Sequence, residues 1–585
     1  MEWVQGYDPF GQVALSTLVA ALPIGTLLAA LAVWQWPAHR AALAGLVTAL
    51  VVAVAAFGMP IGSALAAALR GAAYGLFPIG WIVLCALILY NLSVHTGTFE
   101  TIRHSVARVS PDRRVQALLI AFSFGAFIEG AAGFGTPVAI STALLMGLGF
   151  PPLRAAMLSL IANTAPVAFG AIGTPIITLG VVTGISPNLL SAIAGRQLPF
   201  VSLLIPAWLI VTMSGWRGLK GVWPAVLVAG GSFAVVQAVW SNLVGPELVD
   251  IVAALASLGA LAGLCRVWAP RQVWRFPGEP AHDVATPSRN ESAGTRTPLG
   301  ARALLRAWMP WVFLSVFVVL WGLLPVKALL NGGPAGVASY WRTARAPAPH
   351  PALAPVVKVP RLDRVVYREY PVEPRPVDRT RLTDATYRAS HAEAATFTCN
   401  WLSATGTAIL FATLASAWFL GVRPRDVAGV ARRTFVQLRW PLVTIALMLA
   451  LGDVTHYGGT DATLGLAFTR TGRLYPFFAA MLGWLGVALT GSDTSSNVLF
   501  GGLQTITARQ LQLNPALMAA ANSTGGVMGK MIAAQSIVVA TAASNQQGEE
   551  GRLLRAVFWH SVVLAALMGL IVLAQAYWLS WMIPA

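Results

Sequence analysis

The sequence predicts an all-α polytopic membrane protein of about 12 to 14 transmembrane helices, with inverted repeats and broken or re-entrant helices. Three observations lead to this prediction. Hydrophobic residues make up 56% of the 585 residues and charged residues only 10%, whereas a soluble domain has about 25% charged residues. Apolar runs long enough to cross a bilayer recur along the chain. Two of these runs are interrupted by polar, glycine-rich breaks at corresponding places in the two halves.

The apolar runs predict helices that cross the lipid bilayer. A spanning helix needs about 20 mainly apolar residues, and such runs extend from residues 13–34 to residues 557–583. Hydrocarbon cannot hydrogen-bond the backbone, so these segments must pair their own N–H and C=O groups. Residues 1–12 are polar and acidic, and no cleavage pattern follows them, so we expect the first apolar run to be retained.

The net charge of +17 indicates membrane insertion rather than a nucleic-acid partner. Lys and Arg residues lie mostly between the apolar runs, where they keep loops on the cytoplasmic side. Basic loops at residues 103–114 and 423–439 are therefore expected inside, and the N-terminus outside. The cysteines are far apart and no metal-ligand spacing occurs, so we expect no metal site and no cofactor.

These patterns divide the chain into five parts. We expect an N-terminal transmembrane half at residues 1–265, a cytoplasmic linker at 266–306, a transmembrane helix at 307–330, an external loop at 331–400 and a C-terminal transmembrane half at 401–585. The external loop is rich in Pro and Arg and lacks a sustained apolar period. That composition favours an extended surface loop, and a cap that recruits substrate is the alternative.

The first break surrounds Glu129, which lies in an otherwise apolar stretch. An ionised carboxylate is costly in hydrocarbon and usually belongs to a pathway, a relay or an ion pair. Gly133 and Gly135 permit a break, and Pro137 is suited to begin a new helix. The N–H groups of that helix start would be free to bind a carboxylate. The alternative is a kinked, close-packed helix in which Glu129 is only a hydrogen-bond acceptor.

The second break begins at Asp493, which four small polar residues follow, ending at Asn497. Such a cluster suits a water-lined cavity that binds hydroxyl and carboxylate groups, although small polar residues also hydrogen-bond neighbouring helices. A second element follows each break, at Asn163-Thr164 in the first half and at Asn522 in the second. Corresponding interrupted segments in two halves indicate an inverted repeat with the binding site between them.

Two cations are candidates to hold an anion. Lys530 lies among apolar and small residues and could pair with Asp493 or with the substrate, or could reach a helix end. Arg196 could bind a carboxylate with two hydrogen bonds, or could be an ordinary boundary arginine.

Asp453 and His456 could form a titratable pair, or could cap a helix end near the outer surface.

No catalytic motif supports an enzyme. The sequence has no phosphate-binding loop, no dinucleotide glycine motif after a predicted strand and no local Ser/His/Asp arrangement. Without machinery for ATP, coupling to an ion gradient is the simplest source of energy for transport.

Several long motifs closely resemble the signature of the bacterial lactate permease family. They are GAFIEGAAGFGTPVAI at residues 125–140, NTAPVAFG at 163–170, GRQLPF at 195–200, WLSATGTA at 401–408 and LTGSDTSSN at 489–497. The resemblance covers almost the whole chain. It implies a multi-pass carrier in the bacterial inner membrane that imports L-lactate, D-lactate or glycolate together with protons. One departure is Ala533-Ala534, where the family commonly has Ser-Pro.

The resulting hypothesis is a proton-coupled symporter in which the two breaks face each other and hold a 2-hydroxymonocarboxylate. Glu129 is the first candidate for proton coupling, and Asp493 is the second. Lys530 or Arg196 would supply the countercharge. The expected substrate-binding residues are Gly133, Gly135, Thr136, Asn163, Thr164, Arg196, Ser492, Thr494, Ser495, Ser496, Asn497, Asn522 and Lys530. A sodium-coupled carboxylate carrier is the nearest alternative, and a membrane enzyme acting on lipid-linked substrates is a more distant one.

Overall fold

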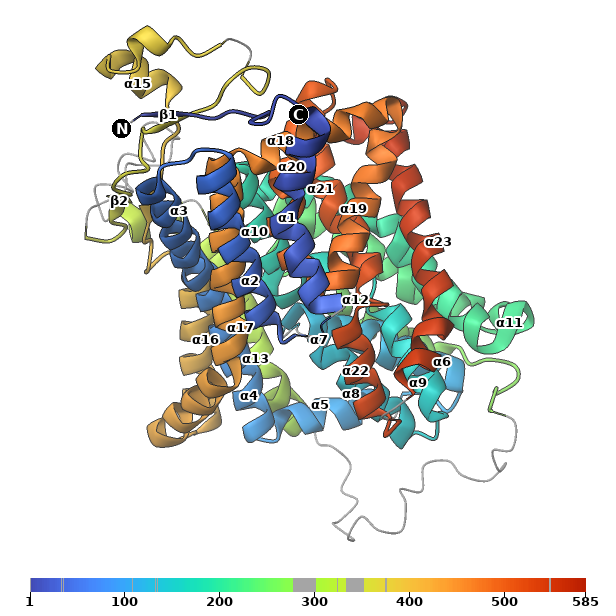
Figure 1. Cartoon of the computed structure of the whole chain (residues 1–585). Coiled ribbons are helices and arrows are strands. Elements are labelled where there is room, and N and C mark those ends of the chain that lie inside the picture. The colour runs from blue at the N-terminus through green and yellow to red at the C-terminus, as the bar shows by residue number, and fades with distance from the viewer. Residues whose placement is uncertain are drawn as a thin grey trace.

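The computed structural model describes residues 2–276 except 33, 35, 108, 132 and 134, residues 301–332 except 324, and residues 352–373, 376–546 and 549–584. This part of the chain is a bundle of helices with two short two-stranded sheets at one end (Figure 1). The predicted all-α class is confirmed. Residues 277–300 of the expected linker and residues 333–351 of the expected external loop lie outside the described residues.

The first part of the chain supplies a short strand and the helices of the first half. Their bounds are β1 (Trp3–Val4), α1 (Val13–Ala32), α2 (Ala38–Val51), η1 (Val52–Ala56), α3 (Ile61–Tyr74), η2 (Gly75–Gly80), α4 (Trp81–His95), α5 (Thr98–Ala107), α6 (Arg113–Ala117), η3 (Leu118–Phe124), α7 (Gly125–Ala131), α8 (Thr136–Gly147), α9 (Pro152–Ala162), η4 (Val167–Phe169), α10 (Gly170–Thr183), α11 (Pro187–Leu243) and α12 (Val249–Val267).

The rest of the chain supplies three further strands and the helices of the second half. Their bounds are α13 (Ala301–Gly322), β2 (Val356–Lys358), β3 (Val366–Tyr367), η5 (Arg379–Arg381), α15 (Ala385–His391), β4 (Thr396–Thr398), α16 (Thr405–Leu420), α17 (Pro424–Gly458), α18 (Thr460–Phe468), η6 (Thr469–Leu474), α19 (Tyr475–Thr490), α20 (Asp493–Gln510), α21 (Pro515–Gly529), α22 (Ala534–Ala543), α23 (Glu550–Tyr577) and η7 (Ser580–Met582).

Among the described residues, seven helices are long and apolar enough to cross a bilayer. They are Ala38–Ala56, Ile61–His95, Arg113–Ala131, Pro187–Leu243, Val249–Val267, Pro424–Gly458 and Glu550–Tyr577. An eighth span results if the bent pair α9 and α10 is counted as one. Shorter apolar helices, such as those at Val13–Leu27 and Thr405–Leu420, fall below this length criterion. The expected 12 to 14 spans counted the first apolar run, residues 13–34, as a spanning helix.

Local sequence explains where several helices begin and bend. Proline stands in the first turn of α9, α11, α17 and α21, where its missing N–H costs no intrahelical hydrogen bond. The side chain of Asn514 caps α21 by accepting a hydrogen bond of 3.0 Å from the Leu517 N–H group. The 57-residue α11 contains non-helical backbone at Gly215 and Val222, so it consists of helical segments that bend at these residues.

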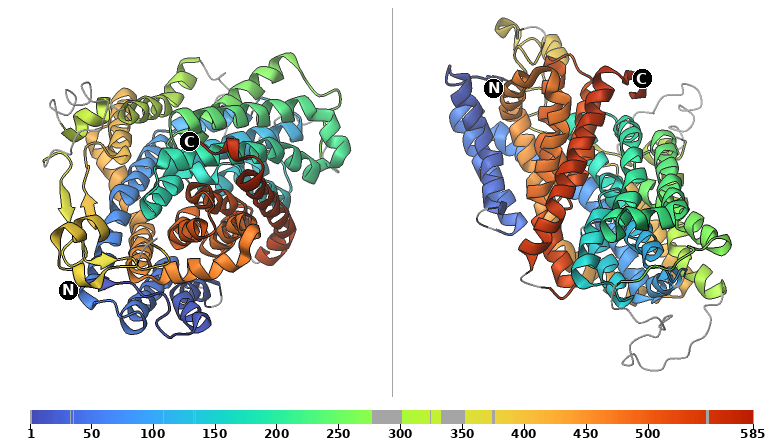
Figure 2. Two further views of the ribbon diagram at one scale, coloured as in Figure 1. Left: turned by 90° about the horizontal axis from the view of Figure 1, so that it is seen from above. Right: turned by 90° about the vertical axis from the view of Figure 1, so that its right-hand side faces the viewer.

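The long helix α17 separates an outer layer from the interior. Helices α2 and α3 pack against it, and α1 packs against α2 (Figure 1). Gly71 and Gly75 allow this approach, because a Cβ atom at either position would meet the α17 backbone within 3.0 Å. Seen from above, the C-terminal helices lie beside the helices around residues 150–260 (Figure 2). Contacts of α21 with α11 and of α20 with α10 confirm this proximity.

Helices α19 and α21 form the closest helix pair of the second half. A Cβ atom at Gly483 would overlap the carbonyl oxygen of Asn522, and one at Gly525 would overlap that of Ala480. Membrane helices often use small residues in this way, because close backbone approach increases van der Waals contact. The pair positions the first residues of α20 against the middle of α21.

The described residues of the segment 331–400 fold against the helix ends. Strand β1 pairs in parallel with β3, and β2 pairs antiparallel with β4. Arg368 forms a buried ion pair with Glu393, whose other carboxylate oxygen lies 3.5 Å from Nε2 of His456. The Gln510 side chain at the end of α20 donates a 2.6 Å hydrogen bond to the carbonyl of Pro371. We call residues 352–373 and 376–400 the cap.

Asp453 and His456 contact different partners in the structure. Asp453 accepts a 2.6 Å hydrogen bond from Arg70 on α3, which makes an ion pair between α3 and α17. His456 lies between Glu393 of the cap and Asp461 of α18, 3.5 Å from each carboxylate. Both residues therefore join the end of α17 to its surroundings.

We predict that acidification loosens the cap. Burial acts to raise the pKa of Glu393, but the charges of Arg368 and His456 outweigh it and lower that pKa to about 2. A carboxyl group whose pKa is lowered on folding stabilises the fold above its unfolded pKa, near 4.5, and this stabilisation is lost as the pH falls towards 2. Hydrogen exchange of the cap, corrected for the intrinsic rate, should show protection at pH 6 that declines below about pH 4.

Glu393→Gln is the matched control for this pH experiment, because the amide cannot titrate. Its cap should already be less protected at pH 6, and its protection should depend little on pH. Equal loss of protection on acidification in both proteins would contradict the assignment to Glu393.

We also predict that Gly525→Ala destabilises the α19–α21 pair. The added methyl group meets the α19 backbone rather than a flexible side chain, and overpacking of this kind costs about 1–3 kcal/mol. Gly263→Ala in α12 is the control, because a Cβ atom at Gly263 would have no heavy atom within 4 Å outside the backbone of its own helix. The melting temperature in detergent should fall for Gly525→Ala and stay the same or rise for Gly263→Ala.

Candidate functional site

Four helix breaks define the candidate site. Two separate α7 from α8 and α9 from α10 in the first half, and two separate α19 from α20 and α21 from α22 in the second. The backbone at these breaks is non-helical, with positive φ at Gly133 and Gly135 in one and at Gly491 in another. Broken helices are tolerated at membrane depth only where protein or a cavity surrounds the freed backbone groups.

The helices that follow the first break of each half run in opposite directions. Helix α8 lies at the lower end of the bundle (Figure 1) and leads from its break to Phe150, whose ring centroid is 5.1 Å from that of Phe276. Helix α20 leads from its break to Gln510 and the cap at the upper end. The arrangement agrees with the inverted repeat that the sequence predicts.

Glu129 lies on the last turn of α7, directly before the first break. Its side chain is only 4% exposed, and its Oε2 atom has no hydrogen-bond partner among the described residues. The glycine at position 170 makes room for it, because a Cβ atom there would lie 2.6 Å from Oε1 of Glu129. The carboxyl group therefore occupies space that a side chain at position 170 would otherwise fill.

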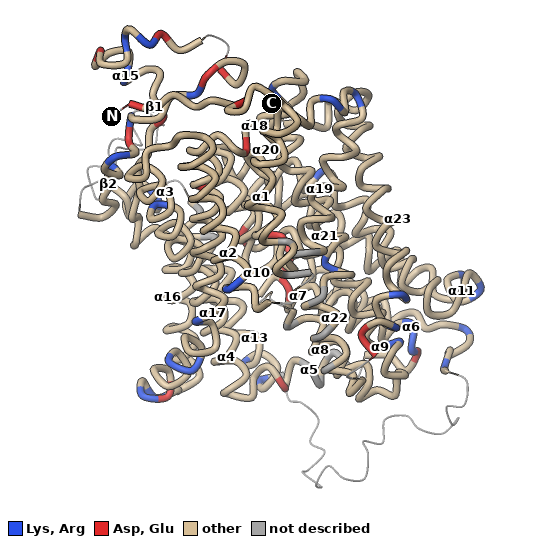
Figure 3. The backbone as a smooth tube through the Cα atoms, viewed as in Figure 1, with Lys and Arg blue, Asp and Glu red and all other residues tan. Residues whose placement is uncertain are grey.

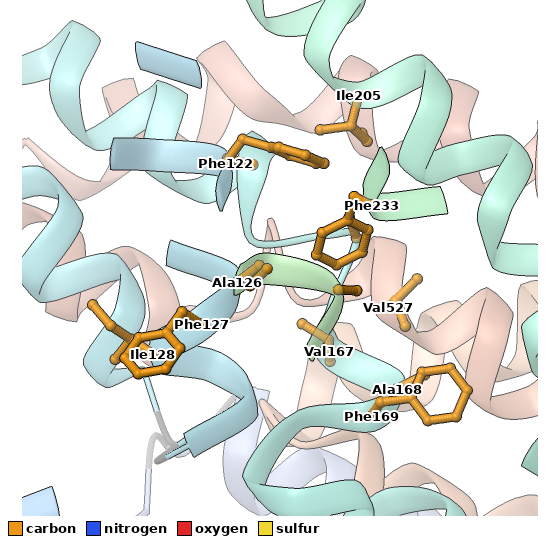
Figure 4. Close-up of a cluster of buried hydrophobic side chains, with 14 of the residues drawn as sticks. Phe122, Ala126, Phe127, Ile128, Val167, Ala168, Phe169, Ile205, Phe233 and Val527 are labelled. Carbon is orange, nitrogen blue, oxygen red and sulfur yellow. The ribbon is translucent and has the colours of Figure 1, made fainter. Parts of the chain in front are cut away.

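Apolar side chains from the elements around Glu129 form a buried cluster. Phe127 and Ile128, which precede Glu129, belong to this cluster, and it also includes Val167 and Phe169 (Figure 4). These residues come from α7 and from the break between α9 and α10.

The break between α9 and α10 brings unpartnered polar groups to the same region. The two helices are bent by 66°, and Ala171 and Ile172 adopt positive φ. Asn163 lies beside the Glu129 carboxyl group. Neither polar atom of its amide, nor the hydroxyl of Thr164, has a hydrogen bond of standard geometry among the described residues. Buried polar groups without partners are uncommon in native folds and call for an explanation such as a ligand or water.

Asp493 begins α20 in the second half. Its Oδ2 atom accepts a 2.5 Å hydrogen bond from Ser523 on α21 and a 3.4 Å hydrogen bond from Asn497. Its Oδ1 atom has no partner among the described residues and faces Gly526. Ser492 caps the helix by accepting a hydrogen bond from the Ser495 N–H group.

Amide side chains connect the second half internally and to the first. Asn522 donates a 2.9 Å hydrogen bond to the amide oxygen of Asn497 and accepts one of 3.2 Å from Gln504. Asn497 also donates to the carbonyl of Pro175 at 3.2 Å, which connects α20 to α10. Ser496 donates to the carbonyl of Gly483. Asn497 and Ser496 are thus held by the fold.

Lys530 links the two breaks of the second half and lies within electrostatic reach of Glu129 in the first half. The side chain is 6% exposed, and its ammonium group donates a 2.6 Å hydrogen bond to the Gly491 carbonyl at the tip of the α19–α20 hairpin. Both Glu129 and Asp493 act on it electrostatically. Figure 3 shows that most charged positions lie at the two ends of the bundle, with few in its interior. Lys530 is therefore a cation within electrostatic reach of both Glu129 and Asp493.

Not every predicted site residue joins this group. Arg196 donates to Asn242 at 2.8 Å and to the carbonyl of Met582 at 3.0 Å, so it holds the C-terminal segment against α11. The side chain of Thr136 lies outside the described part of the chain. Thr494 and Ser495 are partly buried in the first turn of α20.

Sequence reasoning missed one acidic neighbour of Glu129. Asp250 lies in the first turn of α12, is fully buried and has no hydrogen-bond partner for either carboxylate oxygen among the described residues. The signal was present, because Asp250 is an acid at the start of an apolar run. Its spacing gave no hint that the fold would bring it against α7.

The chain is similar to proteins of known function along almost its whole length. The family described as L-lactate permease matches residues 16–579. "Glycolate permease GlcA" of Escherichia coli (strain K12) is 46% identical over 581 residues, which cover 98% of each chain. "L-lactate permease" of the same organism is 45% identical over 582 residues, and that of Bacillus subtilis (strain 168) is 44% identical over 585 residues, both with 100% of each chain covered. These relatives are named as permeases, not as enzymes.

We predict that Lys530→Met loosens the tip of the α19–α20 hairpin. The substitution removes the charge-assisted hydrogen bond to Gly491, and such bonds contribute about 1.5–3 kcal/mol. Maleimide labelling of Thr494→Cys should therefore become about tenfold faster or more in the Lys530→Met background. Lys220→Met, at an exposed lysine, is the control and should leave labelling unchanged. An unchanged rate in both backgrounds would show that Lys530 does not hold the tip.

Proposed function

The chain belongs to the L-lactate permease family, and on that premise we propose that it is a proton-coupled symporter of lactate and related 2-hydroxymonocarboxylates such as glycolate. It is a multi-pass transporter of the bacterial inner membrane. The substrate is inferred from the permeases it resembles, one named for glycolate and others for L-lactate. The proton is inferred from the charges around the breaks.

The observation that carries the proposal is the position of Lys530. This lysine lies within electrostatic reach of Glu129 and Asp493, and it touches the tip of the opposite hairpin. A monocarboxylate anion entering the site would compete with these carboxylates for the same ammonium group. Lys530 is accordingly the proposed countercharge of the substrate, and the N–H groups at the start of α20 add a second favourable environment for an anion.

Unpartnered side chains supply the remaining contacts in this proposal. The amide of Asn163 and the hydroxyl of Thr164 are free to bind the hydroxyl and carboxylate of a 2-hydroxy acid. The proposed substrate-binding residues are Gly133, Gly135, Asn163, Thr164, Ser492, Thr494, Ser495 and Lys530, and the hydrogen-bonded Ser496, Asn497 and Asn522 support them. Arg196 is left out because its guanidinium group is bound to Asn242 and Met582.

Charge balance links the anion to the proton. Glu129 is buried in a low-dielectric region, where an ionised carboxylate needs a countercharge. When the substrate anion takes Lys530, Glu129 loses that countercharge and is stable only with a proton bound. When the substrate leaves, Glu129 can release its proton and pair with Lys530 again. Anion and proton therefore move together, with Asp493 as the second candidate carrier.

We predict that Glu129→Gln uncouples transport. Wild-type protein in proteoliposomes should accumulate labelled L-lactate up to about tenfold per unit of inward pH gradient if one proton moves with each anion. Excess glycolate should block this uptake. Glu129→Gln mimics the protonated side chain, so it should still exchange labelled for unlabelled lactate but should not accumulate it against a gradient.

Asp426→Asn, at an exposed carboxylate in the first turn of α17, is the matched control and should behave as wild type. Proton-driven accumulation by Glu129→Gln would overturn the role of Glu129. Replacement of Na⁺ by choline separates the alternative, because uptake that stops without Na⁺ would identify a sodium-coupled carboxylate carrier.

A further inference from the structure

We propose that Asp250 is a second coupling carboxylate, which shares the transported proton with Glu129 across the contact between α7 and α12. This inference rests on the proposed function and adds to it a residue from outside the four helix breaks.

The two carboxylates are brought together by the backbone. Gly130 directly follows Glu129, and a Cβ atom at Gly130 would lie 2.9 Å from Cβ of Asp250 and 3.0 Å from the Ile251 nitrogen. Only a glycine lets α7 lie this close to the first turn of α12. Glu129 consequently acts electrostatically on Asp250.

Asp250 has no structural task among the described residues. Its side chain is fully buried, yet neither oxygen accepts a hydrogen bond, so it does not cap α12 although it stands in the first turn. A buried polar group normally finds a partner because an unpaired one costs free energy. Both oxygens of Asp250 and the Oε2 atom of Glu129 are without partners among the described residues. These oxygens are therefore available to share a proton.

No cation neutralises Asp250 in the described part of the chain. Helices α7, η3, α10 and α11 pack against α12. Among the charged residues of these elements, Glu129 acts on Asp250, whereas Arg196 of α11 is bound to Asn242 and Met582. Glu247 precedes Asp250 in the turn and lies beside Gly245. Lys530 interacts with Glu129 and Asp493. Glu129 and Asp250 are neighbouring buried carboxylates, and Lys530 is the one countercharge available to the pair, so they cannot both be ionised at once.

The shared proton gives the coupling step a direction. With substrate bound at Lys530, Glu129 and Asp250 each carry a proton. When the anion leaves, the O–H bond of Asp250 breaks and its proton passes to water, while the proton of Glu129 moves to Asp250. Glu129 becomes the carboxylate that pairs with Lys530, and Asp250 stays neutral. The proton and the anion leave through different groups, and no further reactant is required.

Asp250→Asn tests this role, because the amide keeps the size of the side chain but cannot bind a proton reversibly. In proteoliposomes, lactate exchange should stay within about threefold of wild type, since Lys530 and the breaks are untouched. Accumulation driven by one pH unit should fall about tenfold, to the level of no gradient. The pH profile of exchange should also become flatter. Glu247→Gln, in the same turn, is the control and should accumulate lactate as wild type does.

The outcomes separate this inference from the proposed function. If wild-type protein does not respond to a pH gradient, the proposed proton symport fails. If wild-type protein and Asp250→Asn both accumulate lactate with the same pH profile, only the role of Asp250 is overturned. Asp250→Glu keeps a carboxyl group and should restore coupling at least in part, which a purely steric role of Asp250 would not predict.

An infrared measurement tests the shared proton even if Asp250→Asn does not fold. In protein labelled with ¹³C at aspartate and carrying Asp493→Asn, a protonated aspartate carboxyl band at pH 7 is expected from Asp250. Glu129→Gln should change the position or intensity of this band, because it removes the partner carboxyl. If no protonated aspartate is found at pH 7, Asp250 does not hold the proton and the inference is wrong.

Discussion

The need to pair every backbone polar group inside the membrane determines how this chain can build a binding site. Each of the four helix breaks frees N–H and C=O groups that lipid cannot satisfy. Side chains from neighbouring elements supply partners: Lys530 donates a hydrogen bond to the Gly491 carbonyl, and Asn497 donates one to the Pro175 carbonyl. The breaks must therefore lie against one another in the protein interior. Their mutual burial, rather than any single motif, creates a polar region in a bundle that is otherwise apolar.

The same burial makes the charge balance strict. Glu129, Asp250 and Asp493 are interior carboxylates, while Lys530 is the cation that the described residues bring to Glu129 and Asp493. In a low-dielectric region an excess of acid over base requires bound protons or bound cations. A carrier with such an interior is sensitive to which anion occupies the lysine. Glycines at positions 130 and 170 are part of this design, because their missing side chains let the carboxylates approach α12 and α10.

The sequence predicted the fold class well because apolar length and backbone pairing leave few alternatives in a membrane. It also predicted the first break of each half, where Gly133, Gly135 and Gly491 have the positive φ that favours glycine. The break between α21 and α22 forms although the residues from Lys530 to Ala534 include no proline, so proline is not needed there. Long-range partners were not predictable. Nothing in the local sequence connects Asp250 with Gly130, Arg196 with Met582 or Asp453 with Arg70, because these contacts are set by how helices pack.

The pairing of β1 with β3 has a consequence for how the protein is made. Trp3 and Val4 find their partners at Val366 and Tyr367, which follow more than half of the chain. During synthesis the N-terminus must wait, unpaired, until the membrane helices between them have been inserted and residue 367 has reached the same side. Contacts this distant in sequence form late in folding, because a long loop must close first. The small parallel sheet can therefore form only after the helices between its two strands have been inserted with the correct topology.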